Sequence, residues 1–434
     1  MKASDFRLKD GVHNPVSKHH AINLSSLVLL VVFFSMFSRT LTAMGVPSVV
    51  NFLHFLLVTI LFSLSLTKVR ENISVGFIGG LLSLLMLLVI SALINGAGLI
   101  NIVLDFLLLS EPFMLLFVMT SVRWKKSSYK RFQFWLIVIV SIHIIISYYQ
   151  GVVLGHNSDD VVGLFLNMGA GSHIAGAFSL TAAVYVLFVL REWPFWFKVG
   201  SSLACFGVVI LSDSKQVIAV FLVALIIMFF LKTSDLKKAV KYLLLAITLI
   251  TVVIIAANTI FPALNTWSQM SLLVQGVEQK FSVFSIIISY YDSFSNWLFG
   301  LGPGHSVGRL GFLANDYSDY LQPLGITNSL ATNAVWNAHQ GHFISNSITG
   351  SSMFSLFFSW AGVWGDLGMF GLVVYLSLWW QVWRKVCVDD ISKYFLLTIL
   401  VFGSVFSWME EPEYMIFMVC VIGLRWQNVQ RTKQ

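Results

Sequence analysis

The chain has 434 residues, of which 57% are hydrophobic and only 11% are charged, and its formal net charge is +7. No soluble fold can bury so large an apolar fraction, so the composition excludes a soluble globular protein and predicts an all-α polytopic membrane protein. Repeated apolar runs of about 20 residues are expected to be helices, because backbone polar groups in hydrocarbon must be paired within the segment. The three cysteines predict neither a disulfide nor a metal cluster.

Apolar runs predict about 12 transmembrane helices. They lie near residues 22–38, 46–67, 75–94, 99–120, 132–152, 164–190, 197–212, 216–231, 241–261, 355–382, 394–409 and 414–426. The chain then divides into helices one to nine (1–261), one large loop (262–352) and helices ten to twelve (353–434). The first run resembles a signal peptide, but the small-residue site near Ala43 is weak and many spans follow, so we expect an uncleaved helix.

The positions of the positive charges along the chain predict which side of the membrane each connector lies on. Of the 27 Lys and Arg residues, 23 lie in the tails or in alternate connectors, on one face of the predicted bundle. The positive-inside rule makes that face cytoplasmic, so both termini are expected in the cytoplasm and the large loop outside it. In a Gram-negative cell, the protein would lie in the inner membrane with a periplasmic loop, and no nucleic-acid partner is expected.

Four cations fall on the opposite face: Arg39, Lys215, Lys280 and Arg309. Because that face otherwise excludes cations, each is expected to have an acidic neighbour or an anionic ligand. Acidic residues show the reverse bias and gather on the same face as these four.

Helices four and six contain polar residues that need an explanation. An Asp at the centre of an isolated membrane helix costs about 2.5–3.5 kcal/mol on insertion scales, so Asp105 and Glu111 are expected to face a polar interior. The segment from Gly163 to Asn167, continuing to His173 and Gly176, reads either as part of a site or as close helix packing through small residues.

Lys215 stands where the eighth helix begins, in the sequence Leu211-Ser-Asp-Ser-Lys-Gln216. There its ammonium and the free N–H groups of the first turn would point together, an arrangement that binds phosphate. The alternative is a lysine at the membrane interface that pairs with Asp213.

The large loop carries most of the remaining candidates. Lys280 opens an amphipathic segment, and glycines at 300, 302 and 304 allow a tight turn close to a ligand or another segment. That turn lacks the Gly-Lys-Ser/Thr ending of a nucleotide-binding loop. His339 and His342 are potential proton acceptors near neutral pH, and without a third ligand at a fixed spacing we expect no metal.

The segment from Glu410 to Glu413 reads as a solvated outer connector. The alternative is that its acids orient cations or act as a base.

The order of these parts resembles that of the bacterial O-antigen polymerases of the Wzy type and O-antigen ligases. Ser214-Lys215-Gln216 stands where the family often has a Ser-Arg-Gly-like sequence. Lys280 and Leu301-Gly-Pro-Gly304 match a basic residue and a glycine turn of the loop. Gly163 to Asn167 and Gly368-Met-Phe-Gly371 match two further glycine motifs. Phe357-Phe358 replaces the His-Asn pair of the ligases, which favours the polymerase.

The resemblance implies a GT-C-like membrane glycosyltransferase. It would extend oligosaccharide units linked to undecaprenyl pyrophosphate at the periplasmic face, without a cofactor, metal or nucleotide sugar. Lys215, Lys280 and Arg309 would bind the diphosphate. Arg39 is a weaker candidate for this role, because it lies so near the N-terminus. Asn167, Gly302 and Gly304 would line the substrate site.

The resemblance also requires a general base and suggests partners. His342 or His339 would be the first choice of base, and Asp316 or Glu410 the second. Besides membrane lipid, it suggests a chain-length regulator and a flippase as partners. The alternatives are an O-antigen ligase, a transporter of lipid-linked oligosaccharide and a glycosyltransferase that modifies proteins.

Overall fold

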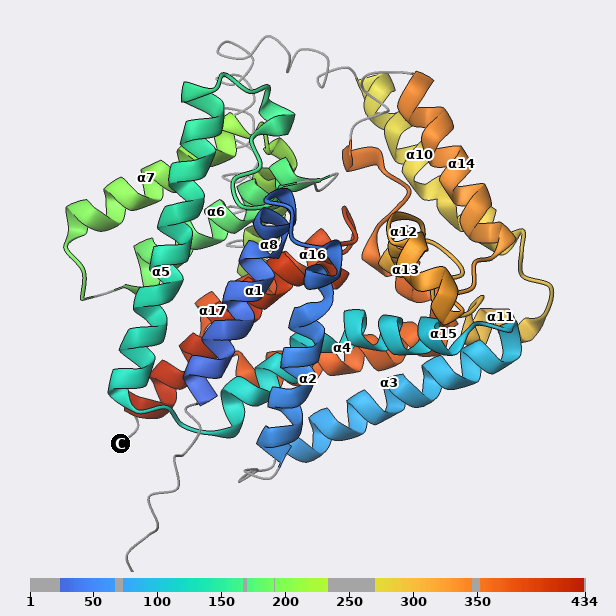
Figure 1. Ribbon diagram of the computed structural model, residues 1–434, viewed down its shortest axis with the longest axis horizontal. Helices are drawn as coiled ribbons and strands as arrows, with labels where there is room; N and C mark the ends of the chain where they lie inside the picture. Colours follow the sequence, from blue (N-terminus) through green and yellow to red (C-terminus); the bar gives the residue numbers. More distant parts are fainter. Residues whose placement is uncertain are drawn as a thin grey trace, which may run out of the picture.

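The protein is all helical in its computed structural model, which describes residues 24–66, 73–166, 170–190, 192–232, 270–345 and 352–432 (Figure 1). No strand occurs in these ranges. The first eight helices are α1 (Leu24–Ala43), α2 (Leu53–Leu66), α3 (Ile73–Asn95), α4 (Leu99–Ser121), α5 (Lys126–Tyr148), α6 (Gly171–Val189), α7 (Phe195–Leu211) and α8 (Lys215–Lys232). The others are α10 (Met270–Ile288), α11 (Phe294–Phe299), α12 (Arg309–Asp316), α13 (Ser318–Leu321), α14 (Leu330–Ser345), α15 (Ser359–Gln381), α16 (Asp390–Phe402) and α17 (Pro412–Thr432).

Eight helical segments of the described chain are long and apolar enough to cross a membrane. They include α1 to α6, α8 and the segment that contains α15, whereas α7 is apolar but shorter. Every predicted run inside the described ranges overlaps a helix, but α7, α16 and α17 are not among the eight segments. The run at 241–261 lies outside the described residues, and twelve spans remain a prediction.

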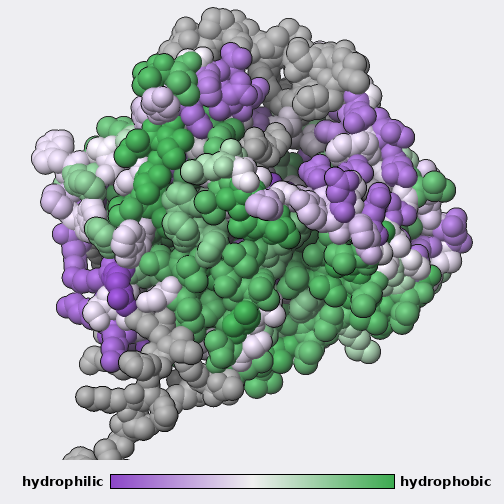
Figure 2. Space-filling view, in the orientation of Figure 1, coloured by the Kyte–Doolittle hydropathy of each residue, from purple (hydrophilic) through white to green (hydrophobic). Residues whose placement is uncertain are grey.

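The distribution of hydrophobic side chains on the surface is typical of a membrane protein. In the view of Figure 2, a broad hydrophobic area covers the centre and lower right, and hydrophilic areas lie at the upper right and at the lower left edge. Exposed apolar side chains of α1 to α3 include Phe33, Leu56, Ile60, Leu82 and Met86. Such a surface is stable against lipid and not against water.

The centre of the bundle is formed by α17 and α4. α17 packs against α4, α6, α1 and α16, and most of its side chains are buried. Phe113 of α4 contacts Trp379 and Tyr375 of α15, with ring centroids 4.5 and 5.7 Å apart. These large side chains bring the N-terminal and C-terminal helices into one core.

The start of α6 differs from the expected one. The helix begins at Gly171 and not at residue 164, because the preceding segment is bound by side chains of another helix. Gln150 accepts hydrogen bonds from the N–H groups of Val162 and Gly163 at 3.0 and 2.7 Å, and His143 accepts one from Leu164 at 3.3 Å. The polar residues of this stretch therefore support a turn between α5 and α6.

The large loop is a packed set of helices. α10 packs against α14, α11 packs against α15, and α12 packs against α4. In Figure 1, α12 and α13 lie between the α10–α14 pair and the end of α4. The loop therefore covers one end of the central helices.

α15 is broken at Gly368, where φ is +64° and ψ is −159°. A Cβ at this position would lie 2.5 Å from the backbone carbon of Leu298. The left-handed conformation and the close approach of α11 both require glycine.

We expect Gly368→Ala to destabilise the protein by at least about 1–3 kcal/mol, since an L-residue is strained at these angles. Thermal unfolding of the purified protein in detergent measures the effect. Gly79→Ala in α3 is the matched control, because no atom lies within 4 Å of its added methyl group. Equal melting temperatures for the two variants would contradict this account of the break.

Candidate functional site

The end of the connector between α16 and α17 and the first turn of α17 carry three buried carboxylates. Glu410, Glu411 and Glu413 are 2%, 1% and 3% exposed. The expectation of a solvated outer connector is therefore wrong. Buried carboxylates need cations, hydrogen bonds or protons, because an unpaired ion in an apolar interior costs several kcal/mol.

Arg309, the first residue of α12, contacts two of these acids. Its guanidinium Nη1 forms an ion pair with Oε2 of Glu411. Its backbone N–H donates to Oε2 of Glu410 at 2.7 Å. Glu410 thus occupies the amino end of α12, where unpaired N–H groups favour an anion.

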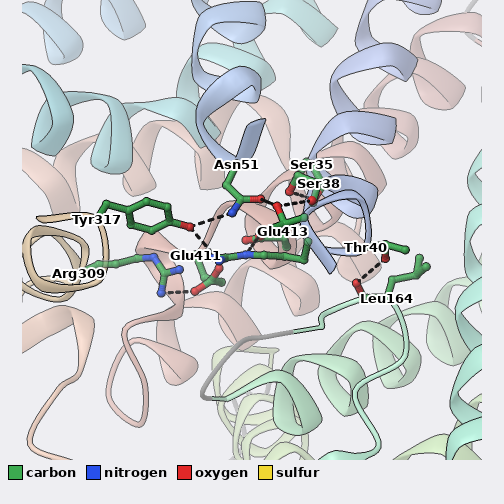
Figure 3. A network of polar contacts seen from close by, with 11 residues as sticks. Ser35, Ser38, Thr40, Asn51, Leu164, Arg309, Tyr317, Glu411 and Glu413 are labelled. Atoms are coloured by element: carbon green, nitrogen blue, oxygen red, sulfur yellow. Dashed lines mark hydrogen bonds and ion pairs between the residues drawn. The ribbon is translucent and has the colours of Figure 1, made fainter. Parts of the chain in front are cut away.

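Arg39 binds the third acid from α1. Its Nε donates to Oε1 of Glu413 at 3.3 Å, and its Nη1 donates to the hydroxyl of Tyr317 at 3.0 Å. Asn51, in the turn before α2, donates to the same hydroxyl at 2.8 Å. Figure 3 shows Tyr317 and the Arg309–Glu411 pair converging on this network from one side and Asn51 from another.

A histidine and a glutamate lie beside this network. Nδ1 of His54, in the first turn of α2, is 2.6 Å from Oε1 of Glu111 in α4, and both side chains are buried. Glu111 therefore faces a polar group of the interior, as expected, and that group is His54. A carboxylate that holds Nδ1–H leaves Nε2 as the proton acceptor, which is the arrangement of a general base.

These groups share one small cleft. Its volume is about 20 Å³, which is enough for a single water molecule. Arg39, Arg309, Tyr317, His54 and Glu413 line it. Two of the four cations on the predicted outer face thus meet in one place, with an acid and a histidine.

The glycine-rich turn binds an internal carboxylate. Asp366 of α15 accepts hydrogen bonds from the N–H groups of Gly304 at 3.1 Å and Ser306 at 2.7 Å. Its backbone carbonyl accepts one from Gly302 at 3.1 Å. The N–H groups of the turn are therefore paired with the carboxyl group of Asp366 and are not open to a ligand.

Carboxylates outnumber cations in this part of the bundle. The buried acids are Asp105, Glu111, Asp366, Glu410, Glu411 and Glu413. Among the described residues, Arg39, Arg309 and, when protonated, His54 are the cations that pair with or hydrogen-bond to them. Asp105 is close enough to Asp366 and Glu410 to interact electrostatically.

The excess of acid is balanced by protons. Burial raises the pKa of Glu410 to about 8. At neutral pH, Glu410 is therefore mostly protonated. Its Oε1, like Oδ2 of Asp105, has no hydrogen-bond partner in the described protein.

Lys280 lies elsewhere, under the end of the large loop. Its ammonium donates to the carbonyls of Met353, Ser355 and Val405 at 3.2, 3.1 and 2.9 Å, and it lies 4.5 Å from the ring centroid of Phe358. None of these groups carries a full negative charge, so burial lowers the pKa of Lys280 to about 7.

Of the two environments expected for Lys215, a phosphate site or a pair with Asp213, the structure shows the pair with Asp213. Its ammonium is 2.9 Å from Oδ2 of Asp213, and Asp213 adopts a left-handed φ of +47° in the turn before α8. A Cβ on Gly176 would lie 2.3 Å from Oγ of Ser214, so this glycine allows close packing of α6 on that turn. Neither Lys215 nor Lys280 lines the cleft.

The remaining candidates do not line the cleft either. Asp316 is exposed at the end of α12, and His339 lies half-buried in α14 with its ring centroid 5.1 Å from that of Phe357. His342 lies in α14, but its side chain falls outside the described residues, as does all of Asn167. The structure thus brings Arg39 and Arg309 together, with Glu410 bound to the backbone N–H of Arg309, and leaves Lys215, Lys280, Asp316 and His339 outside the cleft.

Comparison of the chain with models of protein families and with curated protein sequences gave no match.

The sequence gives no sign of His54 as a member of the site, nor of the contacts of Tyr317, whereas the alternative that the acids of the 410–413 segment orient cations is confirmed for Glu411 and Glu413. His54 sits inside an apolar run and Tyr317 in a polar loop, and neither position signals a partner. Glu413 belonged to a noticed cluster, but only Glu410 was singled out from it. The available signal was the pairing of excess acids and stray cations on one predicted face.

We expect Arg309→Met to cost about 3–5 kcal/mol of stability, because it leaves Glu411 buried without its cation. Lys215→Met should cost less than about 1 kcal/mol, since the Lys215 and Asp213 side chains are 30% and 44% exposed. The double variant Arg309→Met/Glu411→Gln should recover part of the loss. Thermal unfolding in detergent measures the stability of all three variants. If Lys215→Met lost as much stability as Arg309→Met, the buried ion pair would contribute no more than the exposed one, which would contradict this prediction.

Stability should depend on Lys280 in a defined pH window. Between pH 7 and about 10.5 the unfolded chain keeps the Lys280 proton and the folded protein releases it, so this lysine makes stability rise with pH there. Lys280→Met lacks that contribution. The melting temperature of the native protein minus that of the variant should therefore increase from pH 7 to pH 10, and a constant difference would contradict the assignment.

Proposed function

We propose that the protein is a membrane glycosyltransferase that polymerises oligosaccharide units linked to undecaprenyl pyrophosphate. The observation that carries the proposal is the meeting of Arg39 and Arg309 in one cleft, on the face where the charge pattern predicts few cations. The order of the sequence motifs supports the same class of reaction. The proposed location is the inner membrane, with this cleft toward the periplasm and both termini in the cytoplasm.

The two arginines suit a diphosphate leaving group. When the C1–O bond of the donor sugar breaks, its electron pair goes to the diphosphate oxygen, and guanidinium groups aimed at that oxygen stabilise the new charge. Glu411 and Glu413 hold the two guanidiniums in place through Nη1 of Arg309 and Nε of Arg39. Nε of Arg309 has no partner in the described protein and is available to a ligand.

His54 is the base that this geometry supports best. In the proposed step, the hydroxyl oxygen of the acceptor sugar attacks C1 while Nε2 of His54 takes the hydroxyl proton. Glu111 fixes the ring through Nδ1. In the proposal, His54 takes precedence over His339, Asp316 and Glu410 because it lines the cleft and they do not, and over His342, whose side chain lies outside the described residues.

The cleft must open for this reaction. Its volume of about 20 Å³ admits a water molecule and not a diphosphate. Tyr317 closes it by accepting hydrogen bonds from Arg39 and Asn51. In the proposal, the donor diphosphate displaces the Tyr317 hydroxyl from Arg39.

We expect Arg39→Gln and Arg309→Gln each to reduce chain growth at least about 100-fold, by removal of a charge that stabilises the leaving group. Purified protein with lipid-linked repeat units is assayed for a ladder of longer glycans, and correct assembly is checked by membrane level and melting temperature. Lys125→Gln is the matched control, because Lys125 is exposed and lies outside the cleft.

His54→Ala should lose activity to a similar extent, because the acceptor hydroxyl then has no base. If both arginine variants and His54→Ala form normal ladders, the cleft is not the active site.

A transporter of lipid-linked oligosaccharide is the second candidate. The buried acids Asp105, Glu111 and Asp366 favour it, because carboxylates inside membrane helices also carry protons in transporters. Protein reconstituted in vesicles would then move the lipid-linked units without lengthening them.

A deletion strain distinguishes a polymerase from a ligase. In cells, loss of the polymerase leaves single repeat units on the lipid A core, and loss of a ligase leaves long lipid-linked chains.

A further inference from the structure

A second, larger cavity lies outside the site described above. It has a volume of about 400 Å³, within the range of small-molecule sites. Its walls come from the start of α5, the connector between α6 and α7, and the last turns of α17. In Figure 1, the C-terminal end of α17 lies beside the start of α5, at the lower left.

The cavity is basic. Lys130, Arg425 and Arg431 line it, and Glu192 is the one acid among its lining residues. Asp389, outside the lining, pairs with Arg425. Counting both acids, the three cations leave an excess of one positive charge.

Two of the cations are available to a ligand. Arg431 stacks on Tyr129 at 4.6 Å from the ring centroid, and its Nη1 is buried with no partner in the described protein. Lys130 pairs with Glu192 at 2.9 Å, but their side chains are 51% and 77% exposed. Exposed pairs contribute little, so Lys130 can exchange Glu192 for a stronger anion at small cost.

The surroundings point to the membrane interface. The connector that borders the cavity continues into Phe195, Trp196 and Phe197, which are 62%, 81% and 46% exposed. Exposed aromatic side chains next to cations are typical of the level of the lipid head groups. The charge pattern predicts that the three wall segments lie on the cytoplasmic face, where anionic lipids bind basic pockets between helices.

We propose that this cavity binds the phosphate of an anionic phospholipid head group. Nη1 of Arg431 and the ammonium of Lys130 contact the phosphate oxygens, and the acyl chains extend along the apolar surface beside Trp196. The bound lipid ties α5 to α17 at the end of the bundle where α17 leaves the core.

The test uses the full-length protein in nanodiscs of phosphatidylcholine with a small fraction of phosphatidylglycerol. Copurifying phosphatidylglycerol is counted by mass spectrometry after detergent extraction and washing. The variant is Arg431→Gln/Lys130→Gln. The control is Arg384→Gln/Lys393→Gln, which removes the same charge from cations that stack on Trp380 and Trp383.

Retention should fall roughly tenfold or more in the variant and stay unchanged in the control, because two cations near an anionic head group act on its affinity. Equal retention by the native protein, the variant and the control overturns the proposal. A second arm adds inorganic phosphate to lipid-free protein. Raised melting of the native protein by millimolar phosphate, absent in the variant, would assign the cavity to free phosphate and overturn the lipid assignment. Arg431→Gln alone is the second variant, because this residue is partly exposed near the end of α17.

Discussion

The structure depends on how the buried carboxylates of the α16–α17 connector and of the first turn of α17 are neutralised. Arg39 reaches Glu413 from the first helix, and Arg309 reaches Glu410 and Glu411 from the large loop. Lys280 binds the carbonyl of Val405 in the same connector. Three segments far apart in sequence thus meet on one short piece of chain. Removal of either arginine leaves a buried carboxylate unpaired. These ion pairs therefore fix the positions of the N-terminal helices, the loop and the C-terminal helices relative to one another.

Helix positions could be predicted from the sequence because lipid imposes a simple rule. A run of about 20 apolar residues has one stable conformation in hydrocarbon, and the described helices follow these runs. The exceptions have local causes. α6 begins late because Gln150 and His143 bind the backbone of the preceding turn.

The site was harder to predict, because its contacts are not local. Glu413 and Arg39 are 374 residues apart, and Glu410 and Arg309 are 101 apart. A run of three acids near the end of a chain resembles a solvated loop unless the partners are known. The glycine turn shows the same difficulty. Its sequence predicts a tight turn close to a ligand or another segment, and its N–H groups donate to Asp366 of α15.

The neutralised cluster also bears on reactivity. Two guanidiniums fixed by carboxylates and a histidine fixed by Glu111 line a cleft that is closed by one tyrosine. Such groups need little reorganisation when a charged ligand arrives, which is the main source of electrostatic catalysis. The separation of Lys215 and Lys280 from this cleft limits the proposed diphosphate site to the two arginines.

The most direct measurement is an experimental structure of the protein with a bound undecaprenyl diphosphate, the leaving group of the proposed reaction. We expect the diphosphate to lie against Arg39 and Arg309, with the Tyr317 hydroxyl displaced and His54 facing the position of the sugar C1. A diphosphate bound at Lys215 or Lys280, with the Arg39–Glu413 and Arg309–Glu411 pairs undisturbed, would contradict it.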